Sequence, residues 1–374
     1  MLEKQKRNVG LDLLRMLLML LVVLVHVIGK GGIQGNGKLN YYTVKLLQVI
    51  GLVAVPTYAM VSGYVGINAK RKISSIINLL LLGILYSFLF SLIFFIIKPN
   101  TISVKELLFT LFPNYWYLLC YLGLFLLMPL LNAGIKGLTK RQLFGVIIGI
   151  FVVFSLTSIF LTPMSFDIFG LNLGYATIWL ACLYIIGAYV KLYGINVFKT
   201  KIKLKWFLVL IVSIILTFLS KVVCVELGYG NFNVLMHYLS PTTLISAVSI
   251  LIIFSKLNFK EKSAKRITWS SQFAFSVYLI HESKYIELNL MTNRFAFVSN
   301  YFCLLIPIVV LGISIAIYLV CMVIDIIRLY VFKALRINKF CSWLGNKIEK
   351  ATSFIHAKVL KEDPEDKDNE KNPL

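Results

Sequence analysis

Charged residues are scarce in this chain, at 14% of 374 residues, whereas an average soluble domain carries about 25%. Hydrophobic residues make up 59%, and the mean hydropathy is +0.84. The sequence also lacks a Walker motif, an HExxH motif, a GxGxxG loop and a carboxylate pair of glycosidase type, which argues against nucleotide-driven transport by this chain alone. The composition predicts an all-α polytopic membrane protein instead.

Acidic residues are few as well, 16 against 38 Lys and Arg, which leaves a net charge of +22. The basic residues fall in short runs between apolar segments, with no basic stripe interleaved with aromatics, so no nucleic-acid partner is expected. The six cysteines are scattered and lack a CxxC or any metal-type spacing. They are interpreted as small hydrophobic residues in helices, and no metal site is expected.

A window of about 19 residues predicts about ten membrane spans. The spans lie near residues 9–29, 46–67, 76–97, 115–133, 143–162, 174–193, 206–225, 238–255, 270–290 and 301–327. The first follows Lys4, Lys6 and Arg7 like a signal peptide, but no small-x-small cleavage site follows it, so it is interpreted as a retained span. The ninth is the weakest because charged residues interrupt it.

Basic residues predict the orientation of these spans. With the N-terminus in the cytoplasm, nineteen Lys and Arg before the C-terminal tail face inward and eight face outward, alternating at every loop. Ten spans then place the C-terminus in the cytoplasm too. Frequent Lys, Ile, Phe and Asn are typical of an AT-rich bacterial genome. The prediction is a multi-pass protein of the bacterial cytoplasmic membrane.

Two parts of the chain differ in composition. Residues 1–330 read as one membrane-embedded domain, because the outer loops are too short for an extracellular domain. Residues 331–374 read as a cytoplasmic tail. Its first part mixes Lys and Arg with apolar residues and predicts a basic amphipathic helix on the inner leaflet, and its polar end is typical of disorder.

Arg15 and His26 interrupt the first predicted span. A charge inside such a segment costs roughly 2.5–3.5 kcal/mol on insertion scales, which favours a position facing the protein interior or a wet cavity. Eleven residues return a helix to within roughly 20° of its starting direction and raise it about 16 Å. The two side chains are therefore predicted to share one face, as a polar track. A packed histidine and an Arg15–Asp12 ion pair are the structural alternatives.

Further candidates lie near the ends of other spans. Ser62 and Tyr64 near the inner end of the second span predict close helix packing and a hydroxyl group there. Trp116 belongs either to an interfacial aromatic belt or to a sugar-stacking platform. His281 and Glu282 are either a functional pair in the ninth span or interfacial, solvated residues. The basic run Lys70, Arg71 and Lys72 is either topogenic or able to hold phosphates.

Four segments together resemble the membrane-bound acyltransferases of family 3, integral membrane proteins of bacteria and eukaryotes that acylate sugars and lipids. These segments are the Arg-x10-His spacing of Arg15 and His26, VPTYAMVSGYVGI, NYWYLLCYLGLFLLMPLLN and SVYLIHE. The resemblance implies cytoplasmic acetyl-CoA as donor and a cell-surface or lipid-linked glycan as acceptor. Many members carry R-x-x-R after the second span, where this chain has Lys70-Arg71-Lys72.

On this resemblance the expected function is an O-acyltransferase, most simply an acetyltransferase. Lys70, Arg71 and Lys72 would hold the phosphates of CoA, and Arg15, oriented by Asp12, would position the thioester or polarise its carbonyl. His26 would deprotonate the acceptor hydroxyl or carry the acyl group. Tyr64, Trp116, His281 and Glu282 are candidates for acceptor binding. A transporter or flippase of a lipid-linked glycan, or a non-catalytic partner in polysaccharide assembly, remains open at this point.

Overall fold

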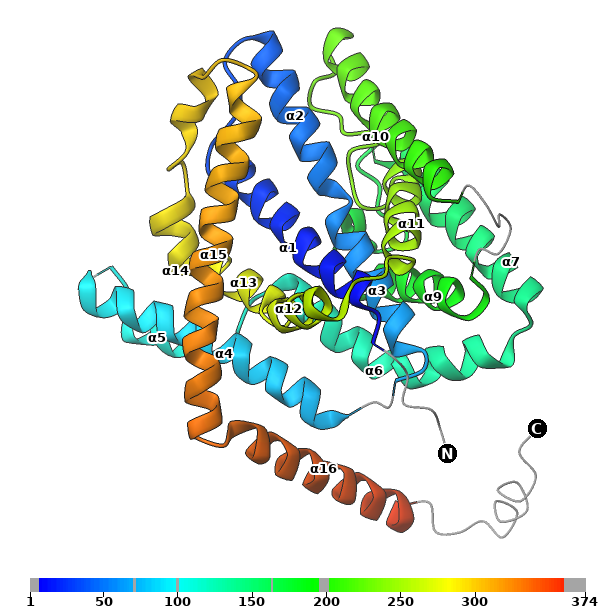
Figure 1. The fold of residues 1–374 in the computed structure, drawn as a ribbon, viewed down its shortest axis with the longest axis vertical. Helices are drawn as coiled ribbons and strands as arrows, with labels where there is room; N and C mark the ends of the chain where they lie inside the picture. Colours follow the sequence, from blue (N-terminus) through cyan, green and yellow to red (C-terminus); the bar gives the residue numbers. More distant parts are fainter. Residues whose placement is uncertain (1–6, 70–71, 99–100, 163, 195–201, 360–374) are drawn as a thin grey trace.

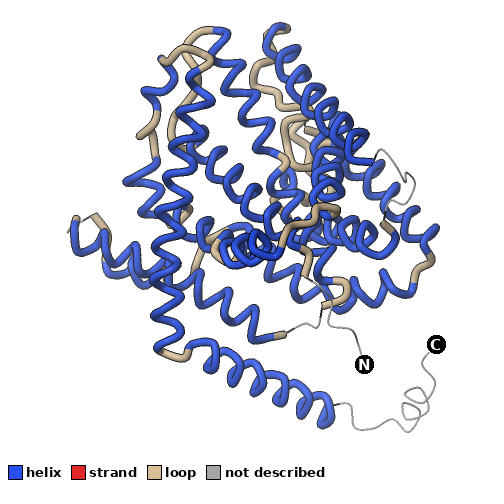
Figure 2. Tube along the Cα trace, viewed as in Figure 1, coloured by secondary structure: helices blue, strands red, loops and turns tan. Residues whose placement is uncertain are grey.

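The structure is a computed structural model that describes residues 7–69, 72–98, 101–162, 164–194 and 202–359. The described residues contain helices and loops and no strand, so the predicted all-α class is confirmed (Figure 2). The helices longer than ten residues are α1 (Val9–Gly29), α2 (Lys38–Leu52), α3 (Ala54–Gly66), α4 (Ile73–Ile97), α6 (Trp116–Gly137), α7 (Lys140–Ile150), α9 (Thr177–Tyr193), α10 (Ile202–Glu226), α11 (Pro241–Ser255), α12 (Glu261–Ser271), α15 (Leu305–Ala334) and α16 (Ile337–Val359).

Shorter helical pieces connect these elements. They are α5 (Val104–Phe109), the π-helix Phe151–Leu156, α8 (Thr157–Leu161), the 3-10 turn Asn172–Gly174, α13 (Ala274–His281), α14 (Lys284–Ile286), the π-turn Glu287–Met291 and the 3-10 turn Ala296–Asn300.

Seven helices among the described residues are long and apolar enough to cross a membrane. They are Val9–Gly29, Lys38–Gly66, Ile73–Ile97, Trp116–Gly137, Lys140–Leu161, Leu204–Glu226 and Leu305–Ala334. Two shorter apolar helices, α9 and α11, occupy the sixth and eighth predicted spans. The chain is therefore a multi-pass membrane protein by length and composition. Ten spans and cytoplasmic termini stay predictions.

The ninth predicted span, residues 270–290, is not one helix. Short helix α13 ends at His281, α14 covers only Lys284–Ile286, and a π-turn follows. Hydropathy averaged over a window hid the break, because the apolar residues before His281 outweighed the polar ones after it. The break leaves His281 and Glu282 at a helix end, where side chains of neighbouring residues can meet partners on different helices.

Helix α1 runs through the centre of the bundle (Figure 1). It packs against α2, α3, α11, α12, α13 and α15, and buries Leu11, Leu14, Leu18, Val23 and Val27. Its first turn is capped by Asn8, whose side chain accepts a hydrogen bond from the backbone of Leu11. A central helix with polar residues on one face must offer those residues to neighbouring helices rather than to lipid.

Helices α3 and α9 cross very closely, as the Ser-Gly-Tyr sequence of α3 predicted. A side chain at Gly63 would run into the carbonyl of Tyr184, and one at Gly187 would run into that of Met60. Ser62, expected to support the site, donates its hydroxyl to the carbonyl of Tyr58 within its own helix. This crossing holds α3 firmly, and with it Tyr58.

A buried ion pair attaches α15 to α4. Arg328 donates to both oxygens of Asp325, at 2.8 and 2.6 Å, and the hydroxyl of Tyr86 on α4 donates to the same carboxylate. Asp325 is fully buried, so its charge is satisfied inside the protein. Beyond α15, the tail forms α16, which begins at Ile337 and packs against α4. Residues 360–374, expected to be disordered, lie outside the described residues.

Candidate active site

Arg15 and His26 lie on one side of α1, as the helical spacing predicted. Met19 and Val22, which lie between them at helical spacing, line a cavity of about 360 Å³ together with His26. Arg15 is outside this lining, but it acts electrostatically on the hydroxyls of Tyr58 and Tyr121. The cavity therefore extends along α1 from His26 toward the turn that carries Arg15.

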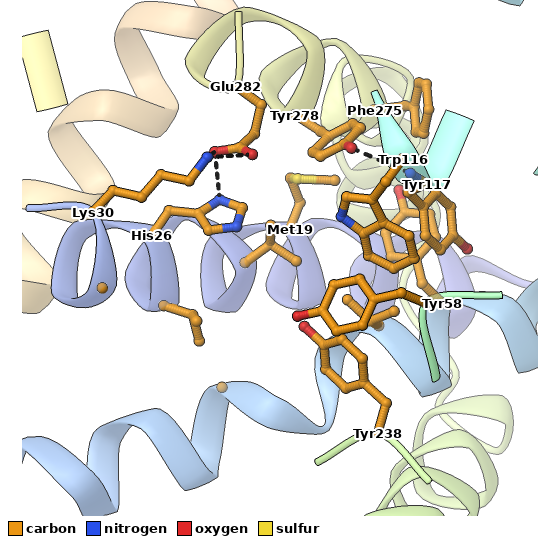
Figure 3. A pocket seen from close by; sticks show the side chains of 16 residues that line it. Met19, His26, Lys30, Tyr58, Trp116, Tyr117, Tyr238, Phe275, Tyr278 and Glu282 are labelled. Atoms are coloured by element: carbon orange, nitrogen blue, oxygen red, sulfur yellow. Dashed lines mark hydrogen bonds and ion pairs between the residues drawn. The ribbon is translucent and has the colours of Figure 1, made fainter. Parts of the chain in front are cut away.

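Aromatic side chains form much of this cavity, which we call the aromatic cavity. They come from α3, α6 and α13 and from the loops before α9 and α11, and they are Tyr58, Trp116, Tyr117, Tyr175, Tyr238, Phe275 and Tyr278. Trp116 stacks on Tyr238 and lies 4.5 Å from Tyr175 between ring centroids. Figure 3 shows His26 and Lys30 at one end of the cavity and Trp116, Tyr58 and Tyr238 toward the other.

His26 meets two residues from the broken segment after α13. Its Nδ1 atom lies 2.9 Å from Nε2 of His281 and 3.1 Å from Oε1 of Glu282. Lys30, one turn further along the chain than His26, donates to both oxygens of Glu282 at 2.8 Å and contacts Glu287 at 2.8 Å. His281 is buried, and the side chains of His26 and Glu282 are 21% and 10% exposed. This cluster is sheltered but open to the cavity.

The hydrogen bonds determine which nitrogen of His26 carries the proton. Nδ1 of His281 lies 2.6 Å from the carbonyl of Val277, which can only accept, so this nitrogen must donate. Neutral His281 then presents a lone pair on Nε2, and Nδ1 of His26 must donate toward it and toward Glu282. We therefore assign the proton of neutral His26 to Nδ1. Its Nε2 keeps a lone pair on the ring edge turned away from Glu282 (Figure 3).

The sequence places Glu282 next to His281, but Glu282 does not orient that imidazole. Adjacent residues leave the chain in different directions, so Glu282 reaches His26 and Lys30 instead, and a backbone carbonyl orients His281. Lys30 and Glu287 were missed by the sequence analysis. The four-residue spacing from His26 to Lys30 was a usable signal, because it places both on one helix face. Nothing local in the sequence connects Glu287 to α1.

The spacing of His26, His281 and Glu282 suits a metal ion, since one ligand atom from each lies within 4.8 Å of the others. Lys30, however, supplies positive charge to both carboxylate oxygens, and His26 donates to His281. Protons thus already satisfy the three potential ligands. We describe the cluster as a hydrogen-bonded network around the imidazole of His26.

Arg15 forms the ion pair expected with Asp12, at 3.2 Å. Asp12 is buried and also binds Arg7 at 2.6 Å and the hydroxyl of Thr268 at 3.3 Å. A guanidinium has five N–H donors, and the pair with Asp12 uses one nitrogen of Arg15. Asp12 therefore holds Arg15 in place while leaving donors for a ligand.

Other candidates lie elsewhere. Trp116 lines the cavity, but Tyr64 lies beside Asn8, Ser255 and Lys191, at the ends of α1, α11 and α9, away from His26. Lys72 is exposed before α4. Lys70 and Arg71 lie outside the described residues. The structure thus brings together His26, Trp116, His281 and Glu282, and leaves Tyr64 and Lys72 apart from them.

Comparison with known proteins indicates the class of reaction. A family model described as an acyltransferase domain matches residues 8–325, which include every residue of the cavity. No curated protein and no solved structure matches the chain at a significant level. The match begins just before α1 and ends at Asp325 in α15.

Proposed function

Because the chain belongs to family 3 of the membrane-bound acyltransferases, we propose that it moves an acyl group from acyl-CoA to a hydroxyl of a cell-surface or lipid-linked glycan. Acyl transfer follows from the family, whereas acetyl-CoA as donor, the glycan acceptor and the inside-to-outside direction belong to the proposal. The observation that supports it is the contact of His26 Nδ1 with His281 and Glu282, which leaves Nε2 of this cavity-lining residue to accept a proton. The family match leaves no support for a transporter.

The proposed reaction uses His26 as the base. Its Nε2 atom takes the proton of the acceptor hydroxyl, and the oxygen forms a bond to the carbonyl carbon of the thioester. The carbon–sulfur bond then breaks, and the imidazolium returns the proton to the departing CoA thiolate. Glu282 stabilises the transient imidazolium, since its carboxylate lies 3.1 Å from Nδ1. Lys30 holds Glu282 in that position through two hydrogen bonds.

In this proposal Arg15 binds the donor at a distance from the carbonyl that His26 serves. The two residues are separated by about 16 Å of helix rise. In the pantetheine arm of CoA, twelve bonds join the phosphate ester oxygen to the sulfur, the same number as in four extended residues, which gives a length of about 14 Å. With the thioester at His26, the phosphate end of the arm would therefore reach Arg15. The proposed role of Arg15 is to bind that end of the donor.

The test is acyl transfer by the purified protein. Radiolabelled acetyl-CoA is supplied to the protein in vesicles together with detergent-soluble glycosides, and labelled glycoside is separated and counted. Label in the glycoside supports the proposal. Movement of a lipid-linked glycan across the vesicle membrane without consumption of acetyl-CoA would contradict it. In cells, the O-acetyl content of the surface glycan should fall on deletion and return on complementation.

Replacing Glu282 with glutamine should lower kcat by about 10- to 100-fold, by analogy with carboxylates that orient metal-bound histidines. The amide cannot stabilise an imidazolium, while it keeps the size of the side chain. The KM for acetyl-CoA should stay the same, because Glu282 does not bind the donor. Glu261→Gln is the control, since exposed Glu261 pairs with Lys265 at 2.7 Å and does not line the cavity. Equal losses of kcat in both variants would contradict a specific role for Glu282.

A further inference from the structure

A second cavity, of about 570 Å³, opens beside the aromatic cavity. We call it the α5 cavity, because α5 and the loop from Thr110 to the start of α6 form much of its wall. Lys30, Trp116, Tyr278 and Glu282 line both cavities. Both spaces therefore adjoin the Lys30–Glu282 pair, which contacts His26.

The two cavities differ in chemistry. Apolar and aromatic side chains dominate the first, whereas the second adds side chains that form hydrogen bonds, among them Glu106, Thr110, Asn114 and Lys284. Carboxylates accept hydrogen bonds from hydroxyl groups, and side-chain amides both accept hydrogen bonds from them and donate hydrogen bonds to them. Phe109, at 60% exposed, lines the same cavity and presents a ring face to which the C–H side of a sugar can stack.

Charge in the α5 cavity disfavours an anionic ligand. The ammonium group of Lys30 is shared by Glu282 and Glu287, so it has little to offer a phosphate. Hydrogen bonds from the backbone N–H of Ser103, which has the larger effect, and from its hydroxyl lower the pKa of Glu106. Glu106 is therefore a carboxylate at neutral pH. Lys284 acts electrostatically on Glu106 and so offsets that charge. The described lining residues thus hold three carboxylates against two ammonium groups.

We propose that the α5 cavity binds the sugar of the acceptor, and that this sugar is neutral or carries an amine rather than a phosphate. The inference rests on the proposed acyl transfer, because a hydroxyl presented from this cavity would reach His26 past Lys30 and Glu282. The donor arm would occupy the aromatic cavity. Two substrates would then meet at one base from separate, chemically different spaces.

The experiment compares variants of the α5 cavity in the purified full chain. Asn114→Ala removes a polar group from the lining, and Glu106→Gln removes the charge while its amide oxygen can still cap α5. Thr139→Ala is the control, because Thr139 caps a different helix, α7, and does not line the cavity. Each protein receives acetyl-CoA and three glycosides: a neutral hexoside, an aminohexoside and a hexoside phosphate.

For Asn114→Ala, the KM for the neutral hexoside should rise about three- to tenfold, as expected for the loss of one hydrogen bond, with the KM for acetyl-CoA unchanged. In the wild type, kcat/KM should be higher for the neutral hexoside than for the hexoside phosphate. Glu106→Gln should make this difference smaller, because it removes a negative charge from the lining. The Thr139→Ala variant should keep wild-type acceptor kinetics. Transfer with unchanged acceptor KM in Asn114→Ala, or a wild-type preference for the phosphate, would overturn the assignment of the cavity. Failure of wild-type protein to acylate any glycoside would instead refute the proposed function, and this inference with it.

Discussion

Replacement of His26 with alanine should lower acyl transfer by about 10²- to 10⁴-fold, the range that a positioned general base contributes. The loss should appear in kcat and should be the same for every acceptor, because Nε2 of His26 acts on the hydroxyl being acylated. His26 is only partly buried and lines a cavity, so its truncation enlarges existing space rather than opening a void in the core. The variant should therefore insert and purify like the wild type.

The control for this variant is His356→Ala, because His356 lies beyond the matched acyltransferase domain. Rates are measured on equal amounts of protein that elute as a single species in detergent. Transfer at the wild-type rate by His26→Ala would remove the imidazole from the mechanism. Mass measurement of the wild-type protein after mixing with acetyl-CoA alone separates two roles for His26. A base leaves the protein mass unchanged, whereas an acyl carrier adds the mass of the acyl group.

Helix periodicity predicted the part of the site that lies on one helix. The spacing of Arg15 and His26 predicted a common face, which the continuous helix α1 provides. The three-residue spacing from Asp12 to Arg15 allowed an ion pair, and this pair is present. Lys30 followed the same periodicity but was counted only as a loop charge. Local spacing is therefore sufficient for α1, because rotation per residue is constant along a helix.

The partners of His26 from the rest of the chain could not be predicted in this way. His281 lies 255 residues away, and the pairing depends on how α13 docks against α1. The break after His281 lets Glu282 reach His26 and Lys30, whereas a continuous ninth span would have directed it elsewhere. Hydropathy also merged the α2 and α3 helices into one shorter predicted span, 46–67, where Lys38–Gly66 extends further toward its N-terminus. Hydropathy averaged over a window detects segments that are apolar enough to enter a membrane, but it does not locate the residues at which helices begin and end.

Replacing Arg15 with alanine should lower kcat/KM for acetyl-CoA by about 10- to 100-fold, the effect of losing a hydrogen bond to a charged group. Because the proposed contact is with the phosphate end of CoA, the loss should appear mainly as a higher KM for the donor. Arg15→Lys keeps the charge but not the planar fork, and should give an intermediate loss. Asp12 would remain paired with Arg7 and Thr268, which limits the structural damage.

A short donor separates this role from a role in the chemical step. The acetyl thioester of N-acetylcysteamine carries the reacting group without the phosphates or most of the arm. With this donor, Arg15→Ala and wild type should react at similar rates, whereas His26→Ala should be inactive with both donors. If Arg15→Ala were equally impaired with the short donor, Arg15 would act at the carbonyl itself, and the thioester would have to lie about 16 Å of helix rise from His26. The base and the acyl group would then be too far apart for a direct attack, and the mechanism would need an acyl carrier between them.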